Sequence, residues 1–448
     1  MKEQFLARMK QMLGEEYDAY LETLQKPPYR GLRVNTLKCT AGQIQESGIA
    51  MLRPAAICAD TFYIEDDTRL GNHPYHMGGM FYLQEPSAAG AVEILDVKEH
   101  DWVLDLCAAP GGKSTQIAAK LKNTGFLLSN EIDSGRAMTL LSNLERMGVS
   151  ENMVTCADPR VLCEQLKGCF DKVLIDAPCS GEGMFKKHAR AMEEWSEAHV
   201  QACAKRQLHI LESGCACVKS GGTLVYSTCT YALEENEAVI DQFLRSHPEM
   251  ELEDCAVSFG RSGIAYGDLD AEKVRRILPM DGGEGHFIAK MRKIGPETSS
   301  KLYFQEAKPR KDVAEWLTGI VDEAFPYAME ENGLIYLKKT PFLLLKKVKV
   351  LRQGIQAGIR KAKRIEPMHH LYMSAVLRSH FKQVCVLHEL SEAYAYLQGN
   401  LIMKSGWHGY VAIAYRGCIL GFGKGDGTQI KNHYPKGLRL SATAHYER

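Results

Sequence analysis

Two cysteines in short polar segments have the residue type and the surroundings that nucleophilic chemistry needs. Cys179 lies in DAPCSGEG, residues 176–183, and Cys229 lies in YSTCTY, residues 226–231; each segment follows an apolar run. A thiolate is a strong nucleophile, but an ordinary thiol with a pKa of about 8.5 is only a few per cent ionised at neutral pH, so a working site should lower that pKa. Either cysteine alone would more often be buried and inert, and the two could also form a disulfide, which a reducing compartment disfavours.

A third segment, DLCAAPGGKS at residues 105–114, has the composition of a ligand-binding loop at the start of a helix. Gly111 and Gly112 allow a ligand to approach the backbone closely, and the free amides of a helix start favour a carboxylate or a phosphate. The pattern is not GxGxxG, so a nicotinamide cofactor is less favoured. Glu131 and Asp158 end the next two apolar runs, where an acid accepts hydrogen bonds from ribose hydroxyl groups, although either acid could instead cap a helix. Three such strand ends in order favour a ligand that contains a nucleoside.

The elements that must position these residues alternate between strands and helices. From residue 101 onward, five short apolar runs are separated by helical patterns, and a later strand is expected at residues 287–291. This alternation predicts a parallel, doubly wound α/β sheet, in which ligands bind beyond the carboxyl ends of the strands. The fourth and fifth strands are neighbours about 4.8 Å apart in the usual strand order, so Cys179 and Cys229 are expected to share one pocket.

The composition is that of an ordinary globular protein. The 448 residues are 45% hydrophobic and 25% charged, and no stretch approaches the roughly 18 apolar residues of a membrane span, so we expect a cytoplasmic protein. The fourteen cysteines lack the regular spacing of a disulfide framework. Cys215 and Cys217 are one residue closer together than the cysteines of a CxxC metal knuckle, so no metal site is predicted.

The net charge of zero conceals two oppositely charged parts. Residues 290–448 contain 26 Lys and Arg against 13 Asp and Glu, a charge of +13, and the rest of the chain carries −13. The densest basic stretch, residues 346–364, holds eight basic residues and no acid, which is typical of contact with a phosphate backbone. The same stretch could instead be the solvated face of a helix.

Four regions are expected along the chain. A small α+β domain at residues 1–75 precedes the doubly wound domain at residues 76–293. Residues 294–365 form a basic linking region to which the sequence assigns no fold. Residues 366–448 contain short β-like runs among glycines, which predicts a small β-rich module.

The segments that contain the two cysteines and the glycine loop together resemble those of a known family. DLCAAPGGKS, DAPCSGEGMF and YSTCTY, with RGLRVNTLK and YLQEPSAAG upstream, are similar to the signature motifs of the RsmB/RsmF family of RNA cytosine-5 methyltransferases, over about residues 29–291. The resemblance implies a class I, Rossmann-like methyltransferase domain that binds S-adenosylmethionine. By motif match, Glu131 would contact the ribose of this cofactor, Asp158 its adenine edge, and Arg136 would lie nearby. The other residues implied at the cofactor are Cys107, Ala108, Ala109, Pro110, Gly111, Gly112, Lys113 and Asp176.

The chemistry of cytosine explains why the family needs two cysteines. C5 of the aromatic ring is a poor nucleophile, so a thiolate must first add to C6 and make C5 enamine-like before C5 can attack the methyl sulfonium group. The resemblance assigns this addition to Cys229 and assigns help with release of the enzyme to Cys179. It also implies that Asp176 bonds the N3/N4 edge of cytosine, with Lys113 assisting nearby. DNA cytosine-5 methyltransferases use the cysteine of the PC motif instead, and physical chemistry alone does not say which thiol attacks.

The order of the regions indicates a branch of the family. Attack at C6 requires the base to leave its stack, so the target is a flipped or single-stranded cytosine. RsmB-type members carry an additional helical domain before the motifs, whereas this chain has a short N-terminal segment, expected to bind RNA, and a long basic extension, as in the RsmF branch. That branch implies a PUA-like RNA-binding module at residues 366–448 and 16S rRNA within the 30S subunit as substrate. The alternatives are a transfer RNA cytosine-5 methyltransferase and a non-catalytic RNA-binding ribosome assembly factor, and the intact chemical residues argue against the second.

Overall fold

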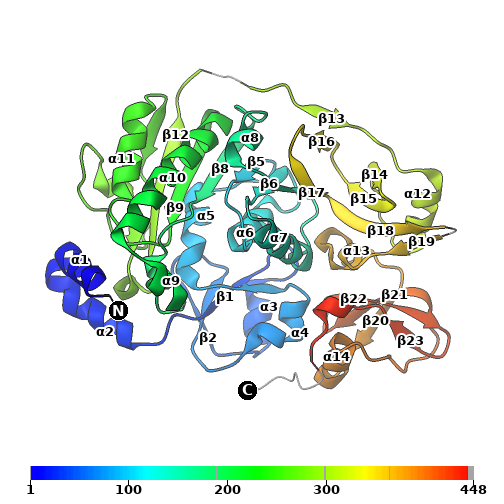
Figure 1. Cartoon of the computed structure of the whole chain (residues 1–448). Coiled ribbons are helices and arrows are strands. Elements are labelled where there is room, and N and C mark those ends of the chain that lie inside the picture. Colours follow the sequence, from blue (N-terminus) through cyan, green and yellow to red (C-terminus); the bar gives the residue numbers. More distant parts are fainter. Residues whose placement is uncertain (1, 188, 297–298, 363, 442–448) are drawn as a thin grey trace.

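A large sheet at the centre of the molecule carries the segments that the sequence singled out (Figure 1). The computed structural model describes residues 2–187, 189–296, 299–362 and 364–441. The parallel strands of this sheet are β5 (Trp102–Asp105), β6 (Phe126–Asn130), β7 (Asn152–Cys156), β8 (Phe170–Asp176) and β9 (Val218–Thr228). The antiparallel strands are β10 (Met250–Glu253), β11 (Arg275–Ile277), β12 (His286–Lys293) and β17 (Lys349–Gln353). Within the described residues the order is β10-β12-β9-β8-β5-β6-β7-β17, with β11 paired to β12.

Helices cover both faces of the central sheet, as a doubly wound fold requires. Those on one face are α5 (Gly90–Leu95), α6 (Gly112–Leu121) and α7 (Ser134–Met147), and those on the other are α8 (Pro159–Cys163), α10 (Glu197–Cys217) and α11 (Glu237–Ser246). Neighbouring residues of one strand enter different cores, because side chains alternate between the faces of a sheet: Val103 belongs to the same core as Leu140 of α7, and Leu104 to the same core as Leu211 of α10. Burial on both faces explains why the strands are short apolar runs. The predicted Rossmann-like α/β domain is confirmed.

Antiparallel strands extend the sheet at both ends. β12 pairs with β9, which confirms the strand expected at residues 287–291. At the other end β17 pairs with β7. Because β17 comes from residues 294–365, this region is more than a link: it covers the edge of the central sheet. The region also contains a small pair of strands, β13 (Tyr303–Gln305) and β16 (Phe342–Leu344).

A smaller sheet from the N-terminal part lies below the central sheet in Figure 1. Its strands, in spatial order, are β2 (Leu52–Pro54), β3 (Thr61–Ile64), β1 (Gly31–Val34) and β4 (Phe81–Leu83), and its helices are α3 (Ala41–Glu46) and α4 (Pro74–Met77). The boundary expected after residue 75 falls inside this sheet, because Leu32 of β1 pairs with Leu83 of β4. Residues 71–79 have the composition of a loop, yet they contain α4, which begins at a proline, a residue suited to the first turn of a helix.

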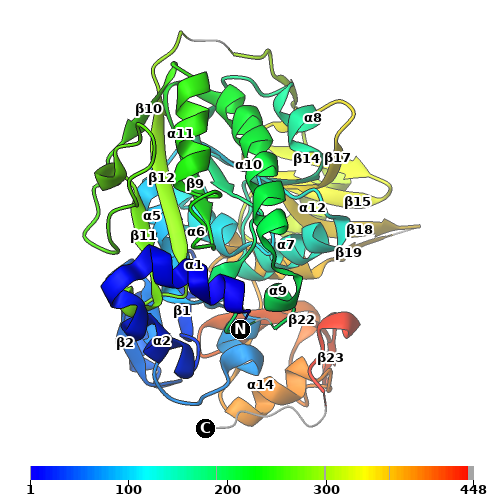
Figure 2. The same ribbon diagram turned by 60° about the vertical axis from the view of Figure 1, so that its left-hand side comes forward.

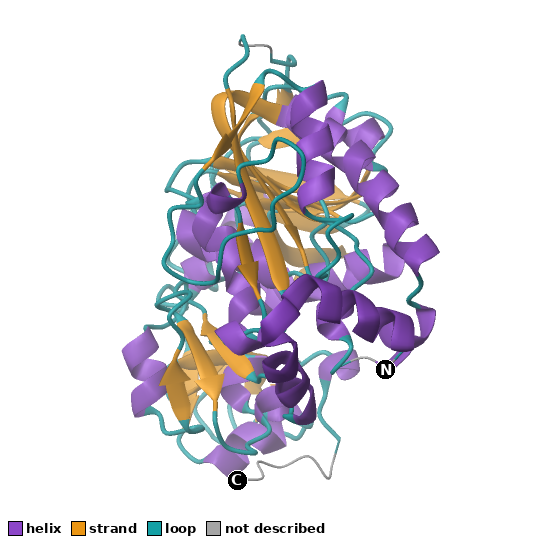
Figure 3. Cartoon of the chain, turned by 90° about the vertical axis from the view of Figure 1, so that its left-hand side faces the viewer, coloured by secondary structure: helices purple, strands orange, loops and turns teal. Residues whose placement is uncertain are grey.

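Two N-terminal helices, α1 (Glu3–Leu13) and α2 (Tyr17–Gln25), pack against the central domain (Figures 2 and 3). Phe5 of α1 makes edge-to-face contacts with Phe185 and Trp195, the latter following α9 (Ala189–Glu194). Tyr20 of α2 contacts the ring of Tyr231, two residues after Cys229. The N-terminal helices therefore support the segment that carries Cys229, one of the two candidate nucleophiles.

Two sheets follow the central domain toward the C-terminus. The first consists of β14 (Tyr327–Glu331), β15 (Leu334–Lys338), β18 (Ile355–Lys361) and β19 (Arg364–Pro367), with helices α12 (Lys311–Thr318) and α13 (His369–Met373). The second consists of β20 (Val384–Leu387), β21 (His408–Tyr415), β22 (Cys418–Asp426) and β23 (Ile430–Asn432), with helix α14 (Leu390–Leu397). One hydrophobic core extends from Val313 to Phe422, so the boundary expected between residues 365 and 366 crosses a shared core.

The two ends of the chain also share a core. Leu32 and Phe81 of the N-terminal sheet belong to the same hydrophobic cluster as Val411 and Leu420 of the C-terminal sheet. Figure 1 shows α4 beside α14 and β22 at this contact. The N-terminal domain and the C-terminal module are thus held together directly. Among the described residues, none of the helices combines the length and the apolar composition that crossing a bilayer requires.

The basic stretch at residues 346–364 folds into strands β17, β18 and the start of β19, so the alternative of a solvated helix face is wrong. Part of its charge is neutralised within the protein: buried Arg352 donates to Glu145 at 2.6 Å, and Arg360 pairs with two carboxylates. Fewer cations than the sequence suggests therefore face solvent. The exposed basic side chains of the stretch are those of Lys346, Lys347, Lys349, Lys361 and Arg364, and Lys363 lies outside the described residues.

Candidate active site

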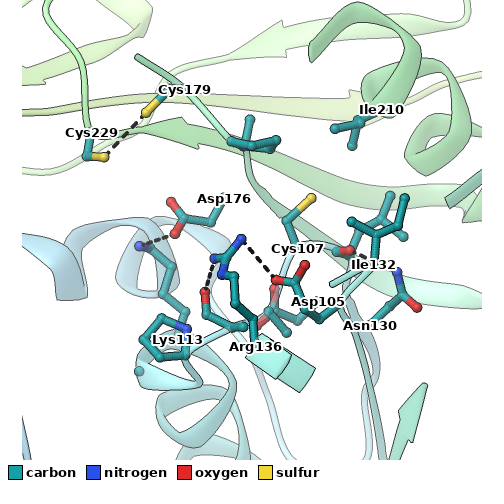
Figure 4. A pocket seen from close by; sticks show the side chains of 18 of the residues that line it. Asp105, Cys107, Lys113, Asn130, Ile132, Arg136, Asp176, Cys179, Ile210 and Cys229 are labelled. Carbon is teal, nitrogen blue, oxygen red and sulfur yellow. Dashed lines mark hydrogen bonds and ion pairs between the residues drawn. The ribbon is translucent and has the colours of Figure 1, made fainter. Parts of the chain in front are cut away.

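A cavity of about 990 Å³ opens beyond the carboxyl ends of the parallel strands, where the doubly wound fold is expected to bind a ligand. The predicted residues that line it are Cys107, Ala108, Ala109, Pro110, Gly112, Lys113, Glu131, Arg136, Asp158, Asp176, Cys179 and Cys229. Figure 4 shows both thiols near Lys113 and Asp176 at one end of the cavity, with Asn130 and Ile132 at the other. Gly111 is not in the lining; its φ of +110°, just before α6, would strain any other residue, so it shapes the loop.

The two cysteines lie side by side because β8 and β9 are parallel neighbours, with Asp176 opposite Ser227. The sulfur atoms of Cys179 and Cys229 are 3.3 Å apart, and both residues are free and partly exposed. The hydrogen bond to Cys229 and desolvation together hold the pKa of the Cys179 thiol well above its ordinary value. The acidity of Cys179 therefore depends on its neighbour.

Asp176 is held in place from two sides. Its Oδ2 atom accepts a hydrogen bond from Lys113 Nζ at 2.7 Å, and its Oδ1 atom accepts one from Ser227 Oγ at 2.8 Å. Burial disfavours the charge of Lys113, but the Asp176 carboxylate outweighs burial and raises the pKa of the ammonium group above its ordinary value. The carboxylate therefore has a fixed direction and a permanent cation beside it, close to the thiol of Cys229.

Glu131 lies at the other end of the cavity, one residue beyond β6. Its side chain is buried, and its carboxylate accepts a hydrogen bond from the backbone N–H of Asp133 at 3.0 Å. Arg136 forms an ion pair with Glu131 at 3.3 Å and donates to the carbonyl oxygen of Ala109 at 2.8 Å. Arg136 thus ties the acid to the glycine loop, and the carboxylate can accept further hydrogen bonds from a ligand.

The sequence allows Asp158 either to contact a ligand or to cap a helix, and the structure shows the capping role. It caps α8, accepting a hydrogen bond from the backbone N–H of Arg160 at 2.8 Å. The side chain of Arg160 also bonds the carboxylate and holds the pKa of Asp158 below its ordinary value. Asp158 lines the cavity as well, so capping and ligand contact are compatible. Glu131 is different, because Asp133 and not Glu131 caps α7.

Several lining residues were not among the predicted site residues. Asp105 ends β5, and its Oδ2 atom accepts a hydrogen bond from Ser114 Oγ at 2.6 Å; burial raises its pKa to about 7. Its place at a strand end is the signal that identified Glu131, so sequence reasoning could have found it. Gln84 and Glu85 line the cavity and lie in the YLQEPSAAG motif, whose residues have no role assigned by the family resemblance. His286 had no local signal, because only the pairing of β12 with β9 brings it to the cavity.

Comparison with known proteins identifies the family. The chain is 32% identical over 468 residues to ribosomal RNA small subunit methyltransferase F of Vibrio cholerae, a match that covers 98% of this chain and 97% of that protein. The chain belongs to this methyltransferase family. The protein of the same name from Shewanella frigidimarina is 31% identical, over 95% of this chain and 94% of its own length.

Three family descriptions match successive parts of the chain. Residues 92–292 match the 16S rRNA methyltransferase RsmB/F family, and residues 1–86 match the N-terminal domain of 16S rRNA methyltransferase RsmF. Residues 386–440 match the methyltransferase RsmF PUA domain. The resemblance drawn from the motifs and the expected C-terminal PUA-like module are therefore confirmed.

Solved structures agree with the fold of the central domain. A methyltransferase homolog from Pyrococcus horikoshii is 29% identical, with a TM-score of 0.57 and a match covering 65% of this chain and 95% of that protein. The structure of NSun6 from Pyrococcus horikoshii with SFG is 23% identical, with a TM-score of 0.58 over 66% of this chain and 99% of that protein, and supports the fold alone.

Proposed function

We propose that the protein transfers a methyl group from S-adenosylmethionine to C5 of a cytosine in 16S rRNA, through a covalent bond between Cys229 and C6 of the base. The observation that carries the proposal is the pair of free thiols, 3.3 Å apart, beside the Lys113–Asp176 ion pair in one cavity. Addition to C6 needs a nucleophile, a proton acceptor and a group that bonds the base edge, and these residues supply all three. Membership in a family of 16S rRNA methyltransferases supports 16S rRNA as the substrate.

The other end of the cavity suits S-adenosylmethionine. Glu131 offers a buried carboxylate to the ribose hydroxyl groups, while Ile132 and Ile210 offer apolar walls to the adenine ring. Among the described residues, nothing donates a hydrogen bond to the buried Oδ1 atom of Asp105, which suits the ammonium group of the methionine portion. Bound there, the cofactor supplies an electrophilic methyl group.

The residues at the thiol end perform the steps on the base. The Cys229 thiolate forms a bond to C6, and the electrons of the C5–C6 double bond move toward N3. Asp176 bonds the N3/N4 edge and keeps a proton at N3, so that the ring can accept these electrons; Lys113 fixes the direction of the carboxylate. C5 is then enamine-like and takes the methyl group. Loss of the C5 proton and cleavage of the Cys229–C6 bond restore the aromatic ring and free the thiolate.

Cys179 is suited to remove the C5 proton because its acidity depends on its neighbour. While Cys229 is free, the hydrogen bond between the two sulfurs is the largest cause that raises the pKa of Cys179. Once Cys229 has become a thioether, its sulfur no longer competes for negative charge, so the pKa of Cys179 falls. Cys179 then loses its proton to solvent and accepts the proton from C5, which times its action to the release step.

Replacing each thiol with alanine tests this division of labour. Cys179→Ala should accumulate a covalent RNA–protein adduct that survives denaturing electrophoresis, because release is blocked after attack. Cys229→Ala should form no adduct. Cys203→Ala, which removes a buried thiol of α10 outside the cavity, is the control and should turn over normally. The reverse pattern, with an adduct in Cys229→Ala and none in Cys179→Ala, would assign attack to Cys179 and refute the proposal.

The substrate is tested by comparing acceptors. The protein is incubated with labelled S-adenosylmethionine and, separately, with 30S subunits, free 16S rRNA and transfer RNA. Label is expected in 16S rRNA as 5-methylcytosine, with the 30S particle as the better acceptor. Label only in transfer RNA would refute the substrate assignment, and binding to 30S subunits without transfer of label would indicate a non-catalytic assembly factor.

A further inference from the structure

His286 reaches the cavity because of the pairing between two strands. β12 is antiparallel to β9, and the last residues paired at the cavity end are Phe287 and Thr228, so His286 and Cys229 come next on their two strands. Side chains alternate between the faces of a sheet, so His286 projects away from the core that holds Phe287. His286 and Cys229 both line the cavity.

A chain of buried hydrogen bonds sets the tautomer of His286. The hydroxyl group of Ser87 donates its single proton to the Glu85 carboxylate, so its oxygen is left to accept a hydrogen bond from His286 Nδ1, 2.9 Å away. The proton of the neutral ring is therefore on Nδ1, and Nε2 carries a lone pair. Burial lowers the pKa of His286 to about 4, which keeps the ring neutral at physiological pH. Among the described residues, no side chain or backbone group bonds Nε2. His286 is thus a fixed, neutral hydrogen-bond acceptor in the cavity.

The order of the strands indicates which part of the nucleotide meets this acceptor. β8, β9 and β12 are consecutive in the sheet, so Asp176, Cys229 and His286 follow one another along its edge. In the proposed reaction Cys229 is placed at C6 and Asp176 at the N3/N4 edge. N1 and its ribose are on the opposite side of the ring from that edge, which is the side of β12.

The hydrogen-bond donors of the target nucleotide also indicate that the ribose is the part that meets His286. A cytidine inside an RNA chain has two kinds of ordinary hydrogen-bond donor, the N4 amino group and the ribose 2′-hydroxyl, because its 3′ and 5′ oxygens are esterified. Asp176 takes the base edge, so the 2′-hydroxyl is the donor that remains for a neutral acceptor. We propose that His286 Nε2 accepts a hydrogen bond from the 2′-hydroxyl of the target cytidine and makes the enzyme prefer RNA over DNA at that nucleotide. This inference rests on the proposed function.

The test compares two oligonucleotides that differ by one oxygen atom. One is an RNA hairpin containing the cytosine mapped in labelled 16S rRNA, and the other carries 2′-deoxycytidine at that position. The wild-type protein should have a kcat/KM about three- to tenfold higher on the all-ribose hairpin, the range of one neutral hydrogen bond. His286→Phe should lose this factor on the ribose hairpin and retain its rate on the deoxy hairpin, so that the ratio falls to about one. His286→Gln, which can present an amide oxygen, should restore part of the ratio.

Two further variants separate a contact with the sugar from a general effect on folding. Ser87→Ala removes the nearer of the two oxygens that face His286 Nδ1, the other being Glu85 Oε1 at 3.3 Å, and should give an intermediate ratio. His247→Phe replaces a ring that stacks on Phe243 outside the cavity, and both its ratio and its rate should match the wild type. A wild-type ratio near one, or a His286→Phe ratio equal to that of the wild type, would overturn the inference while the proposed function stands. If the wild type methylates neither hairpin nor 16S rRNA, the proposed function fails and this inference fails with it.

Discussion

Replacing Lys113 with methionine removes the cation beside Asp176 and keeps a side chain of similar length. The ammonium group donates at 2.7 Å, and the side chains of Lys113 and Asp176 are only 12% and 31% exposed, so solvent screens the pair weakly. A hydrogen bond to a charged group contributes about 1.5–3 kcal/mol. Because this pair is largely buried we expect a loss of about 2–3 kcal/mol of transition-state stabilisation, or about 30- to 150-fold in kcat/KM.

Lys120→Met is a matched control on the same helix. Lys120 pairs with Glu93 at 3.0 Å with side-chain exposures of 30% and 23%, and it lies outside the cavity lining. The assay is single-turnover transfer of labelled methyl groups to 30S subunits, together with thermal melting of each variant. Lys113→Met should slow transfer by the stated factor, whereas Lys120→Met should stay within about twofold, because Lys120 does not line the cavity. Transfer by Lys113→Met within threefold of the wild type, or equal losses in both variants, would refute the assignment.

Three further predictions concern the cofactor end of the cavity. Glu131→Gln should weaken S-adenosylmethionine binding about tenfold in calorimetry, since a charge-assisted hydrogen bond to the ribose becomes a neutral one; unchanged affinity would place the ribose elsewhere. Gly111→Ala should lower the melting temperature and the cofactor affinity, because φ is +110° and the new Cβ would lie 3.1 Å from Leu140 Cδ1; a wild-type melting curve would contradict this. Burial raises the pKa of Asp105 to about 7, so the folded protein binds this proton more tightly than the unfolded chain, and stability falls as pH rises from about 4 to about 7. Asp105→Asn removes this loss, so the melting temperature of the variant minus that of the wild type should increase as pH rises through that window. A difference that stays constant or decreases would contradict the raised pKa of Asp105.

The residues of the site could be predicted because each one lies at the end of a parallel strand, or in the loop or first helical turn that follows it. The carboxyl ends of consecutive parallel strands meet at one edge, so order along the chain is sufficient to bring Lys113, Glu131 and Asp176 to a common cavity. The same rule placed Cys179 beside Cys229, since the two strands before them are neighbours. Assigning the attack to Cys229 required the family resemblance, because adjacency does not distinguish two thiols.

Charge density was a weaker guide than strand order. The basic stretch at residues 346–364 was expected to contact phosphate, yet Arg352 is buried against Glu145 and supports β17 at the edge of the central sheet. A carboxylate more than two hundred residues earlier in the chain decides whether that arginine faces solvent. No local pattern carries this information, because the pairing depends on how α7 and β17 pack.

The sequence by itself determined the alternation of strands and helices, the segments that line the cavity and the family. These are local properties, set by the period of apolar residues and by short motifs. Only the tertiary structure decided that Asp158 caps a helix while Glu131 does not, that the N-terminal and C-terminal sheets share a core, and that His286 lines the cavity that holds Cys229. Each of these depends on the register or packing of elements far apart in the chain, and such contacts are fixed by the folded core as a whole and not by any segment of it.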